Sequence, residues 1–274
     1  MLPTACIAAA TSQSARGSSF VGALNAYTSN LAGAWSVARR LLNSYSGSLI
    51  RIRRSTDNAE QDIGYDSNGN LDTAAVAAFN GLGSSYIRTI YDQSGSNHAG
   101  NATASLQPCI VLTGTLNTLS TGIPACVFDG SNDRLTCANL TNQSVAAYSA
   151  LVKSTGSTWN DSGGFLESAT NDGGDSRLGS VSFNTTAWWT DPTVAAVRKN
   201  GSSLSGPSYN MTTINAAMCL GVDTATPSLG PYNLQMGAMS STVFLAYSLS
   251  ELVAWSTVAN RTAFEANQKA FIGL

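Results

Sequence analysis

The sequence predicts an all-β fold, an antiparallel sandwich of two sheets with a few short helices. After residue 105, short segments of alternating apolar and polar residues recur between turn residues, about every 8 to 15 residues, which is typical of a sandwich. Hydrophobic residues make up 43% of the 274 residues, enough for one large core. No repeat or linker divides the chain. We therefore expect one sandwich domain, residues 31–274, preceded by an N-terminal arm, residues 1–30.

The first expected element is a helix at about residues 35–45. Apolar side chains that begin at Ala34 recur at helical spacing, and Gly47 is suited to end the helix. Ile50 and Ile52 then alternate with two arginines, which predicts a half-buried strand.

The second expected helix covers residues 73–80. Residues 66–70, Asp-Ser-Asn-Gly-Asn, are typical of a turn. Asp72 can accept hydrogen bonds from the first helical amides, and glycines 81 and 83 can end the helix. The next strand is expected from Tyr86 to Tyr91.

Beyond residue 105 we expect short strands up to a closing helix at about residues 258–271. Residues 125–137 indicate a strand, a tight turn at 129–133 and a second strand. Lys199-Asn200-Gly201 is the sequence of a hairpin turn. Further strands are expected at residues 146–152, 164–167, 177–183, 186–189, 194–198, 218–222, 243–247 and 251–255.

The composition argues against several classes of partner. Charged residues make up 11% of the chain, against about 25% in an average domain, and the net charge is −2. Such a surface lacks the basic patches of nucleic-acid-binding proteins and favours an extracellular or virion-surface location. No apolar run approaches the ~18 residues of a membrane helix, and the apolar stretch near the N-terminus is too short for a signal peptide.

The sequence predicts no metal, no cofactor and no disulfide framework. It has five cysteines and one histidine, His98, without the spacing of a zinc site. Cys126 lies in an apolar strand pattern, which favours a buried thiol over a bridge. Two loops offer oxygen ligands for calcium, but such residues are common in turns. These loops contain Asp129, Asn132 and Asp133, and Asn171, Asp172 and Asp175.

Four phrases in the first third of the chain carry a resemblance to a known family. They are Ser44-Tyr45-Ser46-Gly47, Arg54-Ser55-x-Asp57, Asp62-Ile63 and Ile90-Tyr91-Asp92-Gln93-Ser94-Gly95. This stretch resembles the N-terminal half of the catalytic domain of family 54 α-L-arabinofuranosidases. The phrase at residues 128–133, Phe-Asp-Gly-Ser-Asn-Asp, is similar to laminin-G-like sandwiches of phage and bacterial surface proteins. The resemblance implies a concanavalin A-like jelly roll of the kind found in phage virion proteins.

The catalytic phrases that this resemblance implies are absent from the sequence. A retaining glycosidase needs two carboxylates about 5 Å apart. The family carries its nucleophile in a Met-Glu-Ala-aromatic phrase, its acid/base in a Met-Ala-Asp-Leu-Glu-Asn phrase, and a vicinal cysteine pair before them. Glu167 is the nearest candidate nucleophile, with Asp172, Asp175 and Asp191 close to it in sequence. We therefore expect no catalytic residue and no arabinofuranosidase activity.

Acidic and basic side chains alternate through the first strands. They could form an acid–base or ligand site, or ion pairs and turn caps that fix the register of these strands. We favour the second interpretation, with Asp92 accepting hydrogen bonds from backbone amides. The residues are Asp57, Glu60, Asp62, Asp92, Arg51, Arg53, Arg54 and Arg88.

Four aromatic residues are candidate contacts to a neutral glycan. Exposed aromatic rings stack on the apolar face of a sugar, while nearby polar groups bond its hydroxyls. Two of the four are adjacent, so one of this pair is expected to face the core. The candidates are Trp159, Trp188, Trp189 and Tyr209, all in polar, Gly-rich surroundings.

These observations together predict a non-enzymatic structural protein of a virion surface, such as a phage head-decoration, fibre or tail component. Its partners would be other virion subunits or copies of itself, with residues 1–30 as the docking arm. One alternative is a carbohydrate-binding module that adsorbs to glycans. A second alternative is an arabinofuranosidase-like glycoside hydrolase with a rearranged site.

Overall fold

A computed structural model of the chain describes most of its residues. The described ranges are 20–119, 122–140, 145–154, 166–169, 181–183, 188–190, 194–204, 216–224, 233–238, 244, 246–258 and 261–274. They hold two α-helices, α1 (Thr73–Asn80) and α2 (Arg261–Phe271), and two single-turn 3-10 helices, η1 (Ala104–Leu106) and η2 (Ala138–Leu140). The strands are β1 (Leu31–Ser36), β2 (Ile50–Arg54), β3 (Glu60–Ile63), β4 (Ser85–Ile90), β5 (Ala99–Gly100), β6 (Cys109–Leu112), β7 (Thr115–Leu116), β8 (Cys126–Asp129), β9 (Leu135–Cys137), β10 (Ala147–Ser154), β11 (Leu166–Ala169), β12 (Val181–Phe183), β13 (Trp188–Thr190), β14 (Val194–Lys199), β15 (Ser202–Leu204), β16 (Met218–Thr224), β17 (Asn233–Met236) and β18 (Ala246–Trp255).

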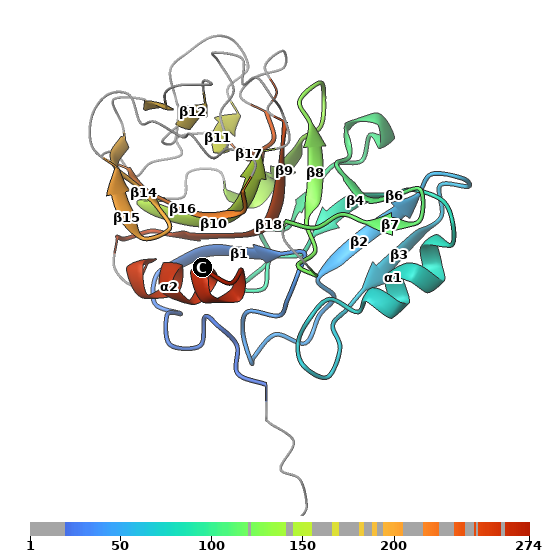
Figure 1. Cartoon of the computed structure of the whole chain (residues 1–274), viewed down its shortest axis with the longest axis horizontal. Helices are drawn as coiled ribbons and strands as arrows, with labels where there is room; N and C mark the ends of the chain where they lie inside the picture. Colours follow the sequence, from blue (N-terminus) through green and yellow to red (C-terminus); the bar gives the residue numbers. More distant parts are fainter. Residues whose placement is uncertain are drawn as a thin grey trace, which may run out of the picture.

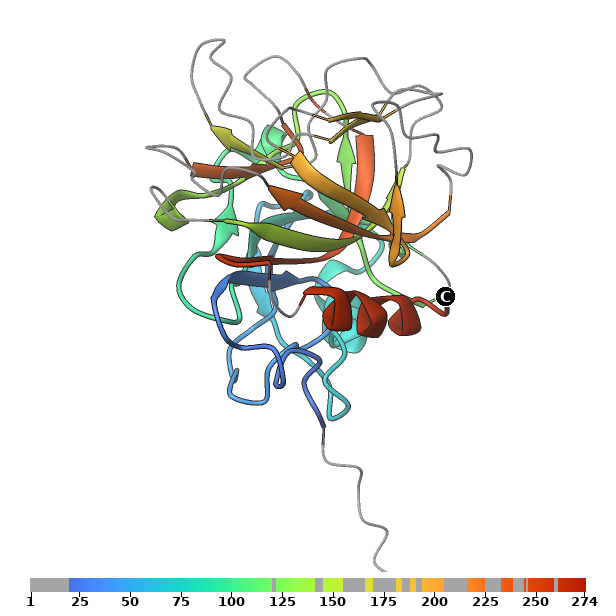
Figure 2. The same cartoon turned by 90° about the vertical axis from the view of Figure 1, so that its left-hand side faces the viewer.

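The described strands pair antiparallel, and Figures 1 and 2 show that they fold over one another in layers. The longest hydrogen-bonded path runs β11-β17-β9-β5-β4-β6-β8-β18-β10-β16-β14-β15. β1 pairs with β18, β2 with β3 and β4, and β7 with β6, while β12 and β13 form a separate ribbon. The predicted all-β antiparallel sandwich is confirmed.

The long strand β18 joins the two parts of the sheet path. Its first residues, 246–249, pair with β8, and its last residues, 251–255, pair with β1. Side chains on β18 alternate between two cores, as period-two geometry requires. Leu252 and Ala254 face the main core, whereas Val253 and Trp255 pack with Phe264 of α2.

Helix α2 covers the outer face of β10 and β16 through polar as well as apolar contacts. Arg198 on β14 donates to both oxygens of Glu265 on α2, at 2.8 to 3.0 Å, and to both oxygens of Asp223 on β16, at 3.0 Å. Arg261 forms a second ion pair with Asp223 at 2.6 Å. Gly221 lies beneath this cluster and leaves room for the Glu265 carboxylate. Figures 1 and 2 both place α2 against this layer.

Several local predictions are confirmed. Asp72 caps α1 by accepting from the amide of Ala75 at 2.9 Å. Asn200 and Gly201, with φ of 54° and 79°, form the turn between β14 and β15, as a two-residue hairpin loop requires. The described part of the closing helix begins at Arg261 and ends at Phe271.

The helix expected at residues 35–45 is wrong. Residues 31–36 form β1, paired with β18, and the following residues run as turns and coil. The apolar spacing has another cause, because the segment passes between two cores: Val37 packs in the main core, and Leu41 and Leu42 pack beside Trp255.

The N-terminal segment contacts the domain from residue 20 onward. Leu24 is fully buried in the small core that contains Trp255, and the Phe20 ring lies 3.9 Å from the Arg40 guanidinium. Residues 1–19 lie outside the described residues. The arm boundary at residue 30 and the docking role of the arm stay predictions.

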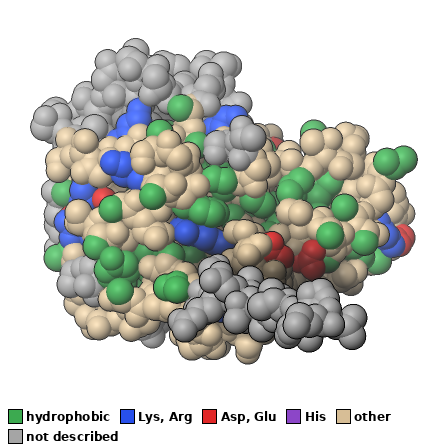
Figure 3. All heavy atoms as spheres, turned by 60° about the horizontal axis from the view of Figure 1, so that its bottom comes forward, with side chains coloured by type: hydrophobic (Ala, Val, Ile, Leu, Met, Phe, Trp, Pro, Cys, Tyr) green, Lys and Arg blue, Asp and Glu red, His purple; other side chains and the backbone are tan. Residues whose placement is uncertain are grey.

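The surface shown in Figure 3 agrees with the charge-poor composition. Backbone and uncharged side chains, including many hydrophobic ones, cover most of the coloured surface, and basic and acidic side chains form small separate groups. Cys126, Cys137 and Cys219 are buried free thiols, and Cys109 is a half-buried one. No helix in the described ranges is long and apolar enough to cross a membrane.

Candidate functional site

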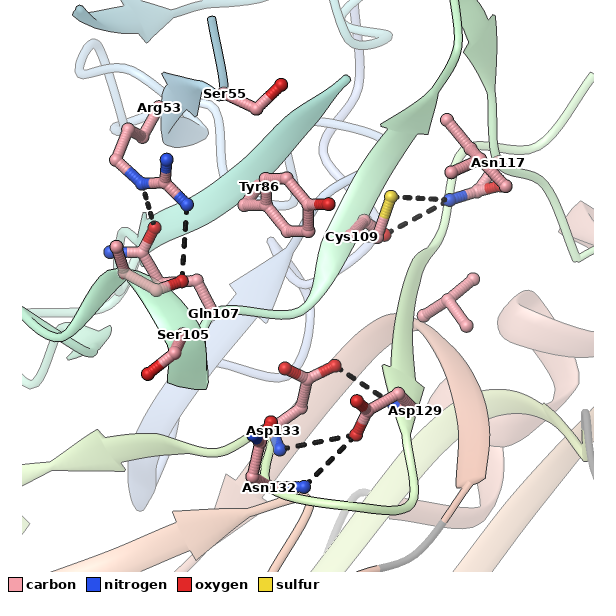
Figure 4. A pocket seen from close by; sticks show the side chains of 13 residues that line it. Arg53, Ser55, Tyr86, Ser105, Gln107, Cys109, Asn117, Asp129, Asn132 and Asp133 are labelled. Carbon is pink, nitrogen blue, oxygen red and sulfur yellow. Dashed lines mark hydrogen bonds between the residues drawn. The ribbon is translucent and has the colours of Figure 1, made fainter. Parts of the chain in front are cut away.

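An open cavity of about 620 Å³ lies among β2, β4, β6 and β8 (Figure 4). Its size is typical of a small-molecule site. The loops that follow β2, β7 and β8, together with η1, complete its walls. The lining residues are Arg53, Ser55, Tyr86, Ala104, Ser105, Gln107, Cys109, Leu112, Asn117, Val127, Asp129, Asn132 and Asp133.

One wall is organised by Arg53, a 9% exposed residue on β2. Its guanidinium donates to Gln107 Oε1 at 2.7 Å, to Asn58 Oδ1 at 2.9 Å and to the Ala104 carbonyl at 3.2 Å. It also lies 5.2 Å from the centre of the Tyr86 ring. All three acceptors are neutral, so these bonds hold Arg53 in place without cancelling its charge.

The opposite wall is the turn between β8 and β9. Asp129 Oδ1 accepts from the amides of Ser131 and Asn132 at 2.7 and 3.2 Å, which is the usual role of aspartate in a turn. Asp133 Oδ2 accepts from the Asp129 amide at 3.0 Å. Gly130, with φ of 75°, occupies the left-handed position of the turn.

Asp133 is the most perturbed acid in the cavity. Burial raises its pKa to about 7, and the nearby Asp129 carboxylate adds to the shift. Only 7% of the residue is exposed, and no basic side chain of the described residues forms an ion pair with it. Its carboxyl group can therefore exchange a proton near neutral pH.

Several polar groups in the wall have no hydrogen-bond partner among the described residues. These groups include Asp133 Oδ1, the Tyr86 hydroxyl and the side-chain amide of Asn132. Within the described part of the chain, Asp133 bonds through Oδ2 and Asn132 bonds through its backbone N–H. Figure 4 shows the second Asp133 oxygen directed toward the space below Tyr86. The cavity therefore offers hydrogen-bond donors and acceptors to a polar ligand.

The two aspartates differ in the hydrogen bonds that they accept. Two carboxyl groups in different environments are a common acid–base arrangement. However, Asp129 Oδ1 already accepts from turn amides, so Asp129 is committed to the turn rather than to attack on a substrate. The cavity is therefore better suited to binding than to a two-carboxylate displacement. Asp129, Asn132 and Asp133, weighed above as calcium ligands, are thus turn and wall residues.

The four predicted glycan contacts cannot be placed against this cavity. Trp159 and Tyr209 lie outside the described residues. Trp188 and Trp189 belong to β13, whose backbone pairs with β12, and Trp189 stands opposite Ser182. Their role in sugar binding stays a prediction.

The candidate nucleophile Glu167 lies on β11. This strand pairs with β17, where Glu167 stands opposite Gln235, and Gln235 in turn pairs with Thr136 of β9. The three candidate partners, Asp172, Asp175 and Asp191, lie outside the described residues.

The charged cluster of the first strands is a structural feature, as favoured above. Arg51 pairs with Asp62 at 2.7 Å across β2 and β3, and Arg54 pairs with Asp57 at 2.6 Å. The first pair joins residues that stand opposite each other on β2 and β3, and the second lies within the turn after β2, as expected for register pairs and turn contacts. A longer pair of 3.5 Å joins Arg88 to Glu60.

Asp92 is a buried turn cap. It accepts from the amides of Ala34, Ser94 and Asn97 at 2.9 to 3.1 Å. His98 Nδ1 in turn accepts from the Asp92 amide. Asp92 thereby ties β1 to the loop after β4.

Sequence reasoning missed the cavity as a site. Arg53 was assigned to the ion-pair cluster, and Tyr86 and Gln107 carried no motif. Only the turn phrase at residues 128–133 had been singled out. The other wall residues become neighbours only when β2, β4 and β6 pair.

Comparisons with known proteins point to one enzyme family. A family model described as "Alpha-L-arabinofuranosidase B, catalytic" matches residues 23–125. An arabinofuranosidase crystallised with arabinofuranosyl-α-1,2-xylobiose superposes with a TM-score of 0.66 at 16% identity. A family 54 α-L-arabinofuranosidase soaked with a cyclic sulfate inhibitor gives 0.66 at 14%, and a mutant of such an enzyme soaked with 4-nitrophenyl α-L-arabinofuranoside gives 0.65 at 14%. Each match covers 92% of this chain but 65% of the other. No curated protein matches the chain.

These findings correct two expectations. The chain was expected to be a non-enzymatic structural virion-surface protein, but the family model and the solved structures point to a glycoside hydrolase catalytic domain. The expectation failed because it gave decisive weight to the missing catalytic phrases, beside the low charge and the lack of a signal peptide. A fold can persist at 16% identity, where phrases of four to six residues need not survive. At such identities the likeness establishes the fold.

Proposed function

We propose that this chain is a glycoside hydrolase that acts on α-L-arabinofuranosides. One observation carries the proposal: 92% of the chain superposes on an arabinofuranosidase bound to arabinofuranosyl-α-1,2-xylobiose. The family match over residues 23–125 supports it independently, because it rests on sequence. The chain spans 65% of the length of the enzymes it resembles, so the proposal concerns the activity of this domain.

Glu167 is the residue that we propose as the nucleophile. It lies in a row of paired backbone positions with Gln235 and Thr136, across β11, β17 and β9. Gln235 and Thr136 are half-buried polar residues, whereas Leu234 and Met236 on either side of Gln235 are buried in the core. The half-buried polar side chains of Gln235 and Thr136 can offer polar contacts to a substrate beside Glu167.

The test is hydrolysis of 4-nitrophenyl α-L-arabinofuranoside, which is monitored through the release of nitrophenolate. We expect turnover by the wild-type protein and a loss of about 10³-fold or more in Glu167→Gln, because a glutamine cannot form the glycosyl-enzyme intermediate. Glu60→Gln is the matched control. Glu60 forms a long surface pair with Arg88, so its removal should leave turnover unchanged.

Two results would separate the parts of this proposal. No turnover by a folded wild-type protein would refute the activity. Equal turnover in wild type and Glu167→Gln, with Glu60→Gln also equal, would refute Glu167 as nucleophile and leave the activity standing. Circular dichroism of all three proteins would establish that each is folded.

A further inference from the structure

We propose that the cavity among β2, β4, β6 and β8 is a second carbohydrate site, which binds a neutral sugar residue through Asp133, Asn132 and Tyr86. The inference rests on the proposed function only for the ligand class, a neutral oligosaccharide. The site itself is argued from residues 53–133. No residue of β11, which carries the proposed nucleophile, lines it.

The first argument is unused hydrogen-bonding capacity. Three polar groups have no hydrogen-bond partner in the described part of the chain: Asp133 Oδ1, the Tyr86 hydroxyl and the side-chain amide of Asn132. Asp133 itself is only 7% exposed. Tyr86 and Asn132 are half-buried, so these groups are open to the cavity and can bond a ligand that enters it. Figure 4 shows these side chains on facing walls of one open space.

The second argument concerns charge. Arg53 donates to three protein acceptors, and Asp129 Oδ1 accepts from turn amides, so these two groups have hydrogen-bond partners within the protein. Figure 4 shows the Arg53 guanidinium turned toward Gln107. The free groups among the described residues include a phenol, a side-chain amide and Asp133 Oδ1. This set fits the hydroxyl groups of a neutral sugar better than an ionic ligand.

The third argument is that the walls are rigid. Arg53 links β2 to η1, Gln107 bonds the Asn101 carbonyl at 2.8 Å, and Asn117 donates to the Cys109 carbonyl at 3.2 Å. A site whose walls are fixed before binding loses less conformational entropy when the ligand enters.

The proposal has a pH signature. A sugar hydroxyl that donates to Asp133 Oδ1 stabilises the ionised carboxylate, so binding should lower the pKa of Asp133 and release protons near pH 7. The groups around Asp133 are Asp129 on β8, Arg53 on β2, Tyr86 on β4 and Cys109 on β6. Burial raises the pKa of Cys109 to about 11, so Cys109 does not titrate in this range. Affinity should therefore rise from pH 6 to pH 8.

The test is isothermal titration calorimetry with xylotriose, a neutral oligosaccharide, in the Glu167→Gln background. Affinities in the millimolar range, to about 10 mM, are measurable in this way. We expect binding that tightens several-fold from pH 6 to pH 8, with proton release detected as a dependence on the buffer's ionisation enthalpy. Asp133→Asn should weaken binding about tenfold and abolish the pH dependence, because it removes the charge but keeps the shape.

Asn132→Ala and its matched control Asn68→Ala make the test specific. Both asparagines lie in turns, but Asn68 is exposed and lies outside the cavity. Asn132→Ala should weaken binding several-fold, and Asn68→Ala should not change it.

Three outcomes would overturn the proposal. They are no binding of xylotriose by the folded protein, pH-independent binding that Asp133→Asn does not alter, and equal losses in Asn132→Ala and Asn68→Ala. Because the background variant lacks the proposed nucleophile, a failure of hydrolysis leaves this binding measurement interpretable.

Discussion

Replacing Gly221 by alanine should break the buried ion cluster that holds α2 on the sheet. Gly221 lies in β16, beneath Glu265 and Arg198. A Cβ at this position would lie 2.1 Å from Glu265 Oε1 and 2.8 Å from Arg198 Nη2. The backbone conformation at Gly221 is one that alanine adopts without strain, so the effect would be steric.

The loss of folding free energy depends on how far the Glu265 carboxylate must move. Ordinary contact begins at 3.4 Å, so the carboxylate would have to shift by roughly 1.3 Å from its 2.1 Å position. The Glu265–Arg198 bonds are 2.8 to 3.0 Å long, and the two residues are 1% and 5% exposed. Arg198 keeps Asp223, so the Glu265 carboxylate is the group left buried without its partner, at a cost of up to about 3 to 5 kcal/mol. That is a large part of a typical folding free energy of about 5 to 15 kcal/mol.

The assay is thermal and urea unfolding of Gly221→Ala beside Gly64→Ala. A Cβ at Gly64 would meet nothing within 4 Å, so this control tests the same substitution without the clash. We expect Gly221→Ala to unfold roughly 10 °C lower, since about 1 kcal/mol shifts Tm by 2–4 °C in a domain of this size, and Gly64→Ala to change little. Equal stability of the two variants would refute the reasoning.

Three further predictions concern single aspartates. Asp92→Ala should lower the free energy of unfolding by about 3 kcal/mol, measured in urea, because three backbone amides lose a buried acceptor; a loss below 1 kcal/mol would contradict the cap. Asp62→Asn should cost less than about 1 kcal/mol and less still in high salt, because the pair with Arg51 is about 40% exposed; a large, salt-independent loss would contradict this. Asp133→Asn should gain stability relative to wild type between pH 4.5 and pH 8. Folding raises the pKa of Asp133 to about 7, so the protonated carboxyl contributes fully to the stability of the wild type at low pH. This contribution is lost as the pH rises through 7. Parallel Tm–pH curves would contradict it.

Local chemistry made part of the fold predictable. Asp72 and the following apolar residues specified α1, and Asn200-Gly201 specified a hairpin, because each signal acts within a few residues. The segment at residues 37–45 misled for the opposite reason. Its apolar residues meet two different cores that only the tertiary fold brings together, and β1 is defined by pairing with β18, more than 200 residues away.

The cavity could not be predicted by the same means. The sequence draws attention to Asp133 because the residue belongs to a compact turn phrase at residues 128–133. That phrase predicts a turn and no binding site. Its raised pKa depends on burial and on Asp129, neither of which a sequence displays. Arg53 could be read equally well as one more member of the charged cluster, because its partners Gln107 and Ala104 come from a loop some 50 residues away.

The proposed catalytic row and the proposed sugar cavity lie in different parts of the sheet. The hydrogen-bonded path runs β11-β17-β9-β5-β4-β6-β8, so β4, β6 and β8, which line the cavity, stand four, five and six places from β11. Glu167 pairs through Gln235 with Thr136, whereas the neighbouring positions Leu234 and Met236 are buried in the core. Successive residues of a strand point to opposite faces, so Gln235 and Thr136 lie on the face away from that core. Loss of hydrolysis in Glu167→Gln and loss of sugar binding in Asp133→Asn should therefore be independent of each other.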